Sequence, residues 1–252
     1  KLEDAQIESF ERDGFLVLER VLEGEVLSSI QAAAKELVQN DKEESDLRIW
    51  HERALFRRPV FRRVLDQTKL IEAELALLGE DAQLLALDLL ATKPGKGGLG
   101  WHRDVNFVCN KTLSINTGIY LQDMTEDVGP LRVVPGSHRW EELPSGNGPF
   151  EGEIQVPVKA GDAVLFDAGL WHSGDANRSE EYRLGLFAYF GRYWIKRMDN
   201  YFTQPLPAEL SQTDDPLKRQ LLGLGLRPGV ASYHGDDEGY NRRGEAGIDF
   251  VM

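Results

Sequence analysis

The sequence predicts a mainly β fold of the jelly-roll type with flanking α-helices, and three observations support it. Residues 1–80 carry mostly helical periodicity in their apolar positions. Residues 81–195 hold several short apolar or alternating segments, separated by Gly, Pro and Asp turns. No helical pattern lies between those segments, so the strands should form a sandwich or barrel and not a parallel α/β sheet. Among such folds a cupin-like jelly roll fits best.

Three helices and one strand are expected in the N-terminal part of the chain. Apolar residues at helical spacing predict helices at 3–13, 24–39 and 59–78. The short apolar run 15–18 is predicted to be an edge strand. The stretch 41–58 is rich in charged residues, and we expect it to be irregular.

The strands of the central part are predicted from apolar runs and from alternation with a period of two. They are expected at residues 84–92, 112–124, 131–134, 154–158, 163–166, from 170 onward, and 182–194. The segment 205–223 should form one or two short helices. The last thirty residues are rich in Gly and charged side chains, and a loose arm, a lid and an oligomer contact all stay open for them.

The length and composition indicate one domain of the soluble type. The 252 residues are predicted to form a single domain, 1–252, with 196–252 as a C-terminal extension. The net charge of −13 argues against nucleic-acid and anionic-membrane partners, because either would need a basic face. The single cysteine, Cys109, cannot form a disulfide within the chain and fits a cytoplasmic location. No apolar run approaches the roughly 20 residues of a membrane-spanning helix, and the N-terminus lacks the apolar region of a signal peptide.

His102 and Asp104 stand two positions apart, and His172 lies 68 positions beyond Asp104. On an extended backbone, residues i and i+2 point to the same face, so His102 and Asp104 can share one metal ion. His172, at the end of a predicted strand, can supply a third ligand once the fold brings it across. Two histidines and one carboxylate form the facial triad of non-haem Fe(II) oxygenases, which leaves positions open for a co-substrate and O2.

These residues also have a simpler explanation, in which none of them binds a metal. A His-x-Asp pair arises by chance in many surface loops, and a lone histidine such as His172 is more often structural. The other histidines, His51, His138 and His234, have no comparable partners, and no metal role is predicted for them. His138, in a Pro-Gly-Ser-His turn, should support a loop.

Arg183 follows His172 by eleven residues and leads a long apolar strand. 2-Oxoglutarate carries a carboxylate distal to its metal-chelating end, and a guanidinium offers a planar fork to such a group without losing its charge. The alternative is a surface salt bridge to Glu180 or Glu181. An arginine at the start of an apolar strand is better placed to point into a barrel.

Together these residues resemble the phytanoyl-CoA dioxygenase family, whose members are Fe(II)- and 2-oxoglutarate-dependent oxygenases on a double-stranded β-helix. The resemblance covers roughly residues 5–195. It rests on Trp101-His102-Arg103-Asp104, Gly129–His138, Gly161-Asp162, and Trp171-His172-Ser173-Gly174 with Arg183.

The resemblance implies a cofactor set and a reaction. His102, Asp104 and His172 would bind Fe(II), and Arg183 would hold the distal carboxylate of 2-oxoglutarate. O2 would then oxidise the substrate while 2-oxoglutarate is converted to succinate and CO2. Related halogenases replace the carboxylate ligand with a small residue, so the presence of Asp104 implies hydroxylation or another oxidation.

Weaker candidates surround this set. Thr117 and Lys93 are predicted to contact 2-oxoglutarate, although a solvated lysine at a strand end is the simpler account of Lys93. The residues predicted to line the substrate pocket are Trp101, Asn106, Phe107, Trp171 and Arg192. The loops 41–58 and 93–100 are the expected substrate cover, because functional residues concentrate on loops over a rigid scaffold.

The predicted function is therefore an Fe(II)- and 2-oxoglutarate-dependent hydroxylase of a small molecule. A small polar metabolite or a natural-product intermediate is the favoured substrate. A CoA thioester would need a basic cluster. The cluster of this kind consists of Arg48, Arg53, Arg57 and Arg58, and we expect it to pair with acidic residues at the surface. Two alternatives stay open: a cupin-like isomerase or dioxygenase that uses the metal without 2-oxoglutarate, and a non-catalytic binding protein. Monomer and homodimer both stay open as well.

Overall fold

The computed structural model describes residues 1–40, 48–197 and 206–230. Its helices are α1 (Asp4–Asp13), α2 (Gly24–Asn40), α3 (Ala54–Arg57), the 3-10 helix η1 (Pro59–Asp66), α4 (Thr68–Leu78), the 3-10 helix η2 (Ser137–Arg139), α5 (Ala208–Ser211) and α6 (Pro216–Leu221). Its strands are β1 (Phe15–Leu18), β2 (Arg48–His51), β3 (Ala82–Thr92), β4 (Ser114–Tyr120), β5 (Leu131–Val133), β6 (Ile154–Val156), β7 (Ala163–Asp167), β8 (His172–Gly174) and β9 (Arg183–Arg192).

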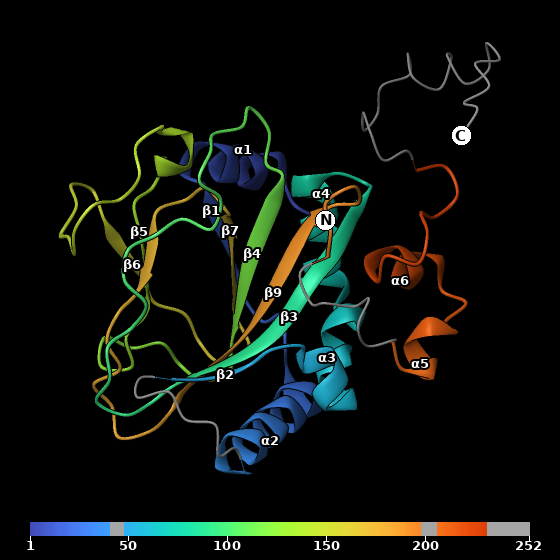
Figure 1. Ribbon diagram of the computed structural model, residues 1–252, viewed down its shortest axis with the longest axis horizontal. Helices are drawn as coiled ribbons and strands as arrows, with labels where there is room; N and C mark the ends of the chain where they lie inside the picture. The colour runs from blue at the N-terminus through green and yellow to red at the C-terminus, as the bar shows by residue number, and fades with distance from the viewer. Residues whose placement is uncertain (41–47, 198–205, 231–252) are drawn as a thin grey trace.

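The strands form two antiparallel sheets. The larger sheet has six strands in the order β1-β7-β4-β9-β3-β2, and the smaller has three in the order β6-β5-β8. Figure 1 shows β5 and β6 to the left of the larger sheet, whose strands β4, β9 and β3 cross the centre. Two antiparallel sheets whose neighbouring strands are distant in sequence make a jelly roll. The predicted fold class is therefore confirmed.

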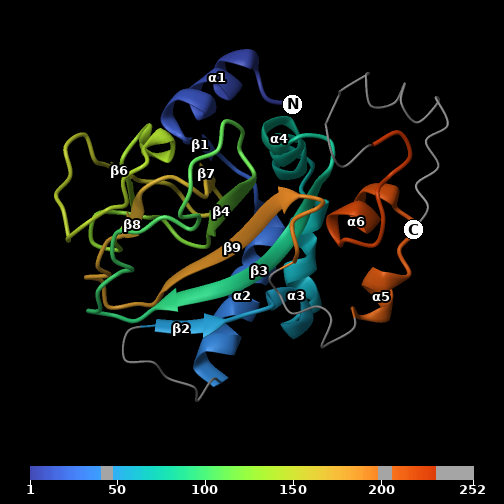
Figure 2. The same ribbon diagram turned by 45° about the horizontal axis from the view of Figure 1, so that its top comes forward.

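The two faces of the six-stranded sheet have different neighbours. Helices α2, α3 and α4 lie along one side of it in both views (Figures 1 and 2). We call this side the helix face, and the side toward the smaller sheet the cavity face. Leu87 of β3, Ile119 of β4 and Leu186 of β9 are fully buried in the core that the sheet shares with the helices. Because successive strand residues alternate, their immediate neighbours point to the cavity face.

Helix α1 ends where the sequence predicts. Gly14 adopts a left-handed backbone with φ of 82° and donates its N–H to the carbonyl of Phe10. A side chain here would be strained by that φ, and its Cβ would lie 2.4 Å from Nδ1 of His138. Glycine is therefore required both by the turn and by the close approach of the segment that contains His138. The loop-supporting position predicted for His138 agrees with this contact.

The stretch 41–58 departs from its predicted irregularity. Arg48–His51 form the edge strand β2, which pairs antiparallel with β3, and Ala54–Arg57 form α3. The pairing of β2 with β3 joins residues about forty positions apart, and a local pattern cannot reveal it. The predicted helix 59–78 is likewise two helices, η1 and α4, that meet at Gln67.

The remaining elements follow the predictions closely. β1 is an edge strand, and α5 and α6 are the two short helices expected within 205–223. Figure 2 shows α5 and α6 beside α3 and β3, at the end of the molecule opposite the smaller sheet. Most of the C-terminal stretch for which an arm or lid was considered, 231–252, lies outside the described residues. Within the described part of the chain, no helix combines the length and apolar content needed to cross a bilayer.

Candidate metal centre

His102, Asp104 and His172 meet between the two sheets. The Nε2 atom of His102 lies 3.6 Å from Oδ1 of Asp104, and the Nε2 atom of His172 lies 3.9 Å from the same oxygen. One potential ligand atom from each residue lies within 4.8 Å of the other two. The imidazole rings are 4.2 Å apart between centroids. Three ligand atoms converging at this spacing can surround one metal ion.

Backbone pairing brings the distant ligands together. His102 and His172 form an antiparallel bridge in which each backbone N–H donates to the other residue's carbonyl at 3.0 Å. Two residues further on, the N–H of Asp104 donates to the carbonyl of Ala168 at 2.8 Å. The ligand-bearing loop between β3 and β4 is thereby held against β8 as an extension of the smaller sheet. The His-x-Asp pair can share a metal if the backbone here is extended, and this pairing meets that condition.

The histidine tautomers are set by backbone carbonyls. Nδ1 of His102 lies 2.7 Å from the carbonyl oxygen of Gly100, and Nδ1 of His172 lies 2.9 Å from that of Leu170. A carbonyl only accepts, so each Nδ1 donates its hydrogen and each neutral ring presents the Nε2 lone pair toward Asp104. Metal-ligating histidines are typically oriented in this way. Burial also lowers the pKa of His172, which favours the neutral form that a metal needs.

Two side chains from the cavity face hold Asp104. Asn116 of β4 donates from Nδ2 to Oδ2 of Asp104 at 3.2 Å. The Tyr189 hydroxyl of β9 also donates to the Asp104 carboxylate, and its pKa is raised by burial and then by the Asp104 charge. Asn116 and Tyr189 are paired across the sheet. The Asn116 bond occupies Oδ2 and leaves Oδ1 turned toward the histidines, which is the orientation a ligand oxygen needs.

Arg183 lies at the other end of the same cavity. Its guanidinium donates to the hydroxyl of Thr92 at 3.1 Å and to the carbonyls of Asp175 at 2.7 Å and Gly129. It lines the cavity together with the three candidate ligands. Arg183 therefore faces the cavity, as an arginine that points into the barrel would, and its acceptors here are two carbonyls and one hydroxyl. These three bonds fix the orientation of the guanidinium at the cavity wall.

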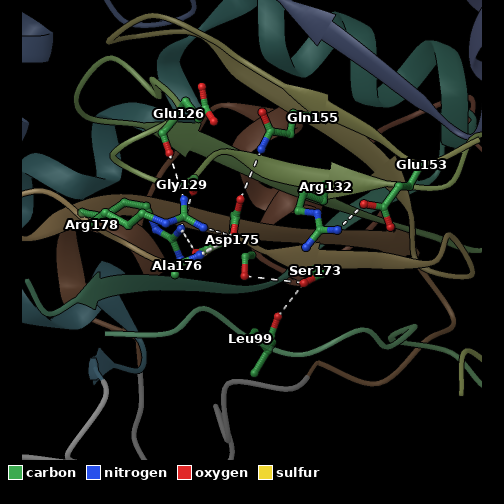
Figure 3. Close-up of polar contacts among 12 residues, drawn as sticks. Leu99, Glu126, Gly129, Arg132, Glu153, Gln155, Ser173, Asp175, Ala176 and Arg178 are labelled. Carbon is green, nitrogen blue, oxygen red and sulfur yellow. Dashed lines mark hydrogen bonds and ion pairs between the residues drawn. The ribbon is translucent and has the colours of Figure 1, made fainter. Parts of the chain in front are cut away.

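The loop 93–100 closes one side of the cavity, as predicted. Ser173 donates its hydroxyl to the carbonyl of Leu99 at 2.9 Å, a contact drawn in Figure 3. The N–H of Gly174 donates to the same carbonyl at 3.1 Å. Gly98 packs so closely that a Cβ would lie 1.7 Å from the carbonyl oxygen of Gly174. The predicted cover 41–58 contributes Trp50 to the lining, and its first part lies outside the described residues.

The segment 137–142 contacts the ligand-bearing loop between β3 and β4. Arg103, which stands between those ligands, is buried and turns away from the metal position. Its Nη1 donates to the carbonyls of Trp140 at 2.9 Å and Glu142 at 3.3 Å. Arg103 received no role from the sequence, and these bonds give it one in fixing the loop.

The same segment also contacts the third ligand's strand. Trp171, directly before that ligand, donates from Nε1 to the Glu142 carbonyl at 3.2 Å and from its backbone N–H to Oγ of Ser137 at 2.8 Å. Its indole packs edge-on against Trp140 and Phe150. The Glu142 carbonyl therefore accepts from both ligand-bearing segments, and 137–142 acts as a clasp behind the metal centre.

A cavity of about 160 Å³ opens beside the triad. That is several times the volume of one water molecule, so it can hold more than a hydrated ion. Its floor is the cavity face of β3, β9 and β4. Its lining residues are Trp50, Asp88, Leu90, Thr92, Gly97, Gly98, Leu99, His102, Asp104, Asn116, Tyr120, Gly129, Leu131, Phe166, His172, Gly174, Arg183, Leu184, Gly185, Phe187 and Tyr189.

The two weaker 2-oxoglutarate candidates lie elsewhere. Thr117 is fully buried on the helix face, where its hydroxyl donates to Glu74 of α4. Thr117 thus lies on the side of β4 opposite to the one predicted, because alternation alone does not say which face looks toward the metal. Its neighbour Asn116 has the position that was assigned to Thr117. Lys93 is half-buried at the end of β3, and its side chain does not line the cavity.

The residues predicted to contact substrate also lie outside this cavity. Trp101 packs edge-on against Phe150, and Trp171 belongs to the clasp. Phe107 borders a separate groove near α1 and α4, and the preceding Asn106 is exposed. Arg192 forms an ion pair with Asp81 at 2.8 Å and borders the same groove. Alternation along β3 and β9 is the sequence pattern that would have identified residues lining this cavity.

Comparisons with known proteins agree with this geometry. The profile of the family described as phytanoyl-CoA dioxygenase matches residues 10–185. The dioxygenase andF of Emericella variicolor is 37% identical over 114 residues, 44% of this chain and 38% of that protein. The dioxygenase af480 of Aspergillus fumigatus is 31% identical over 159 residues, 59% and 50% of the respective chains. The chain thus spans half or less of the length of these two relatives.

Solved structures show the same fold. HygX from Streptomyces hygroscopicus, determined with nickel and 2-oxoglutarate bound, has a TM-score of 0.68 at 18% identity, covering 78% of this chain and 89% of that one. The epimerase SnoN, in complex with Fe3+, alpha ketoglutarate and nogalamycin RO, has a TM-score of 0.66 at 19% identity, with 92% and 93% covered. At these identities the likeness is one of architecture.

Proposed function

The protein belongs to the phytanoyl-CoA dioxygenase family, and on that premise we propose that it is an Fe(II)- and 2-oxoglutarate-dependent dioxygenase. It hydroxylates a small molecule with O2 and converts 2-oxoglutarate to succinate and CO2. The observation that carries the proposal is one cavity lined at once by His102, Asp104, His172 and Arg183. The metal ligands and the anion partner are the two halves of a 2-oxoglutarate site.

The donor set fits iron. Two neutral imidazole Nε2 atoms and one carboxylate oxygen, all facing one point, are the donors of the facial triad and leave other positions open. Asp104 is held by Asn116 and Tyr189 with Oδ1 directed to the histidines. Iron bound there supplies the activation of O2 that is coupled to decarboxylation of 2-oxoglutarate. The protein's own part is to fix the ligands and to keep the positions opposite them open.

Arg183 orients 2-oxoglutarate through its distal carboxylate. Thr92 and the two carbonyls hold the guanidinium, so little side-chain freedom is lost when the anion binds. The loop 93–100, held by the Ser173 hydroxyl, lines this end of the cavity. Binding at Arg183 therefore aims the keto-acid end of 2-oxoglutarate toward the triad.

The outcome at the substrate carbon is proposed to be hydroxylation. The carboxylate ligand Asp104 is present, and a halogenase would need that position empty. SnoN is described as an epimerase on the same architecture, so epimerisation is the second candidate. The two differ in product mass, because hydroxylation adds one oxygen atom and epimerisation adds none.

The proposal is tested by titrating 2-oxoglutarate into the Mn(II)-loaded protein without O2, by calorimetry. Arg183→Ala should weaken 2-oxoglutarate binding about 30-fold or more, because an unpaired carboxylate would be left in the cavity. The matched control is Arg178→Ala, since Arg178 is largely exposed and pairs with Asp175 at the surface (Figure 3). That change should leave the affinity unaltered.

Turnover provides the second measurement. With Fe(II), O2 and 2-oxoglutarate, the wild-type protein should form succinate slowly even without substrate, and His102→Ala should not. If Mn(II) binds but 2-oxoglutarate neither binds nor forms succinate, the cupin-like enzyme without this co-substrate becomes the function. If neither metal nor 2-oxoglutarate binds, the protein is a binding protein and the proposal is wrong.

A further inference from the structure

We propose that the part of the cavity between Trp50 and Phe187 is the substrate subsite, and that it takes an uncharged, hydrocarbon-rich small molecule. This inference rests on the proposed function, because it assigns Arg183 to 2-oxoglutarate. It narrows the expected substrate, for which a polar metabolite was also considered. The strand register, the placement of Trp50 and the charges along the cavity support it.

The strand register arranges the cavity floor in rows that start at Arg183. Thr92 of β3 is paired with Arg183 of β9, so the 2-oxoglutarate end occupies the first row of the floor. Two residues along each strand, Leu90 is paired with Gly185, and two further on, Asp88 is paired with Phe187. Residues two apart share a face, so these rows line one surface in this order. All of these residues line the cavity.

Glycines in the floor leave space for the Phe187 ring. A Cβ at Gly185 would lie 3.1 Å from that ring, and a Cβ at Gly118 of the neighbouring β4 would lie 3.2 Å from it. Both distances are tighter than ordinary side-chain contacts, so a larger residue at either position would displace the ring. The floor is thus shaped to present one aromatic surface beside Leu90.

Trp50 forms the wall beside this floor. It lies on β2 opposite Leu90 and lines the cavity, yet 54% of it is exposed. Its Nε1 donates to Oδ2 of Asp88 at 3.1 Å, and the backbone N–H of Arg53 donates to Oδ1 at 2.8 Å. Asp88 therefore fixes the indole on one side and the turn after β2 on the other. A large, exposed and immobilised aromatic surface at a cavity is a typical small-molecule contact.

The charges along the cavity select against anions. Among the described residues that line it, Arg183 is the one arginine and there is no lysine. With Arg183 assigned to 2-oxoglutarate, a substrate anion would find no further arginine or lysine among the described lining residues and would lie near the Asp88 carboxylate. A buried charge without a partner is strongly unfavourable. A CoA thioester, with its phosphates, does not fit this subsite. An uncharged molecule can instead cover Trp50, Leu90 and Phe187 with hydrocarbon.

Two fluorescent probes of the same ring system test this reading. 2-Aminoanthracene is uncharged at neutral pH, and anthracene-2-sulfonate is its anionic counterpart. Each is titrated into the full chain loaded with Mn(II) and saturating 2-oxoglutarate, without O2, and followed by probe emission. We expect the amine to bind about tenfold or more tightly than the sulfonate. Equal or tighter binding of the sulfonate would overturn the inference.

Variants locate the probe. Trp50→Ala should weaken binding of the amine about tenfold or more, since a full aromatic contact is lost, while Trp50→Phe should keep it within about threefold. The matched control is Trp194→Ala, because Trp194 is 52% exposed but borders the other groove. If Trp194→Ala releases the probe and Trp50→Ala does not, the subsite is elsewhere. Retained binding by Trp50→Phe shows that loss in Trp50→Ala is not unfolding.

Asp88→Asn tests the charge at this subsite. Asparagine keeps an acceptor for the Arg53 N–H, so the turn should persist while the negative charge is removed. The bond from Trp50 Nε1 is lost as well, and this loss should affect the two probes alike. The preference for the amine should then shrink severalfold, through tighter binding of the sulfonate; an unchanged preference contradicts the role given to Asp88.

Failure of the proposed function would look different. The amine titration is repeated without metal and 2-oxoglutarate, where its dependence on Trp50 should persist. Probe binding at Trp50 without succinate formation would remove the dioxygenase function and leave the subsite. Succinate formation with amine binding that is insensitive to Trp50→Ala would remove the subsite and leave the function.

Discussion

The two faces of the six-stranded sheet are built from alternate residues of the same strands and serve different ends. On β3, Leu87 is fully buried among helix residues, while the next residue, Asp88, lines the cavity. On β4, Asn116 contacts the candidate ligand Asp104, while Thr117 contacts Glu74 of α4. Single steps along a strand therefore separate residues of the site from residues of the core.

The difference shows how the fold carries a polar site without losing its core. The helix face is almost entirely apolar, and burial there supplies the main driving force for folding. The cavity face holds Asn116, Tyr189, Asp88 and Arg183, which cost free energy to bury and gain it back only through specific partners. We therefore expect cavity-face substitutions to change binding, and helix-face substitutions to change stability.

The largest expected effect is on metal binding. Asp104→Ala removes the ligand oxygen that both histidines face, so Mn(II) affinity, followed by electron paramagnetic resonance, should fall by more than the roughly 100-fold seen for loss of an outer-shell partner. Succinate formation should disappear, and the thermal midpoint of the metal-free protein should stay close to that of the wild type. If the metal-free Asp104→Ala protein were unfolded, the expectation that cavity-face substitutions change binding and not stability would be wrong.

Leu87→Ala tests the opposite face. It opens a cavity in the core shared with the helices, and the free energy of unfolding should fall by about 2–5 kcal/mol. Leu90→Ala is the matched control, because Leu90 lies on the same strand but borders the cavity and is only partly buried. Urea denaturation should show the smaller loss for Leu90→Ala, and Mn(II) affinity of the folded Leu87→Ala protein should match the wild type.

Glu74, a carboxylate buried in the helix face, should make stability depend on pH. Burial raises its pKa from 4.5 to about 8, and its Oε2 has no hydrogen-bond partner among the described residues. Below pH 4.5 the group is protonated in both states. As pH rises toward 8, the unfolded chain ionises while the folded protein does not, so the free energy of unfolding falls.

Glu74→Gln should remove this slope. The variant should gain on the order of 2–4 kcal/mol relative to the wild type at pH 8, and little at pH 4. Denaturant unfolding at several pH values measures it, with Glu25→Gln on the exposed side of α2 as the control. A parallel pH dependence in Glu74→Gln and the wild type would contradict the prediction.

A pair of neighbours gives the sharpest contrast between the faces. Asn116→Ala removes the donor to Oδ2 of Asp104, and Mn(II) affinity should fall about 10–100-fold with little change in stability. Thr117→Val removes the donor to Glu74, and stability should fall by about 1 kcal/mol with Mn(II) affinity unchanged. If both variants changed the same property, the separation of functions by alternation would not hold.

The smallest expected effect lies behind the site, in the clasp of residues 137–142. Arg103→Lys keeps the charge but cannot reach two carbonyls with one planar fork, so Mn(II) affinity should fall by up to about tenfold. Arg178→Lys at the surface is the control. An unchanged affinity in Arg103→Lys would show that the clasp is needed for folding alone.

Patterns local in sequence were enough to predict the fold class and the four leading site residues. Alternation and turn residues marked the strands, helical spacing marked the first helix at 3–13, and the spacing of His102 and Asp104 matched an extended pair of candidate ligands. The roles of His172 and Arg183 were assigned from the resemblance of the surrounding motifs to the family. These features are readable because each depends on a few neighbouring residues or on residue chemistry alone.

Only the tertiary structure decided which face of each strand became the site. Alternation predicts that Asn116 and Thr117 point to opposite faces of β4, but long-range packing determines which residues each of them contacts. The edge strand that brings Trp50 to the cavity pairs with β3 across about forty residues, and the clasp joins Arg103 to residues beyond β5. The sequence thus determined the candidate ligands, whereas the surroundings that orient them arise from contacts between distant segments.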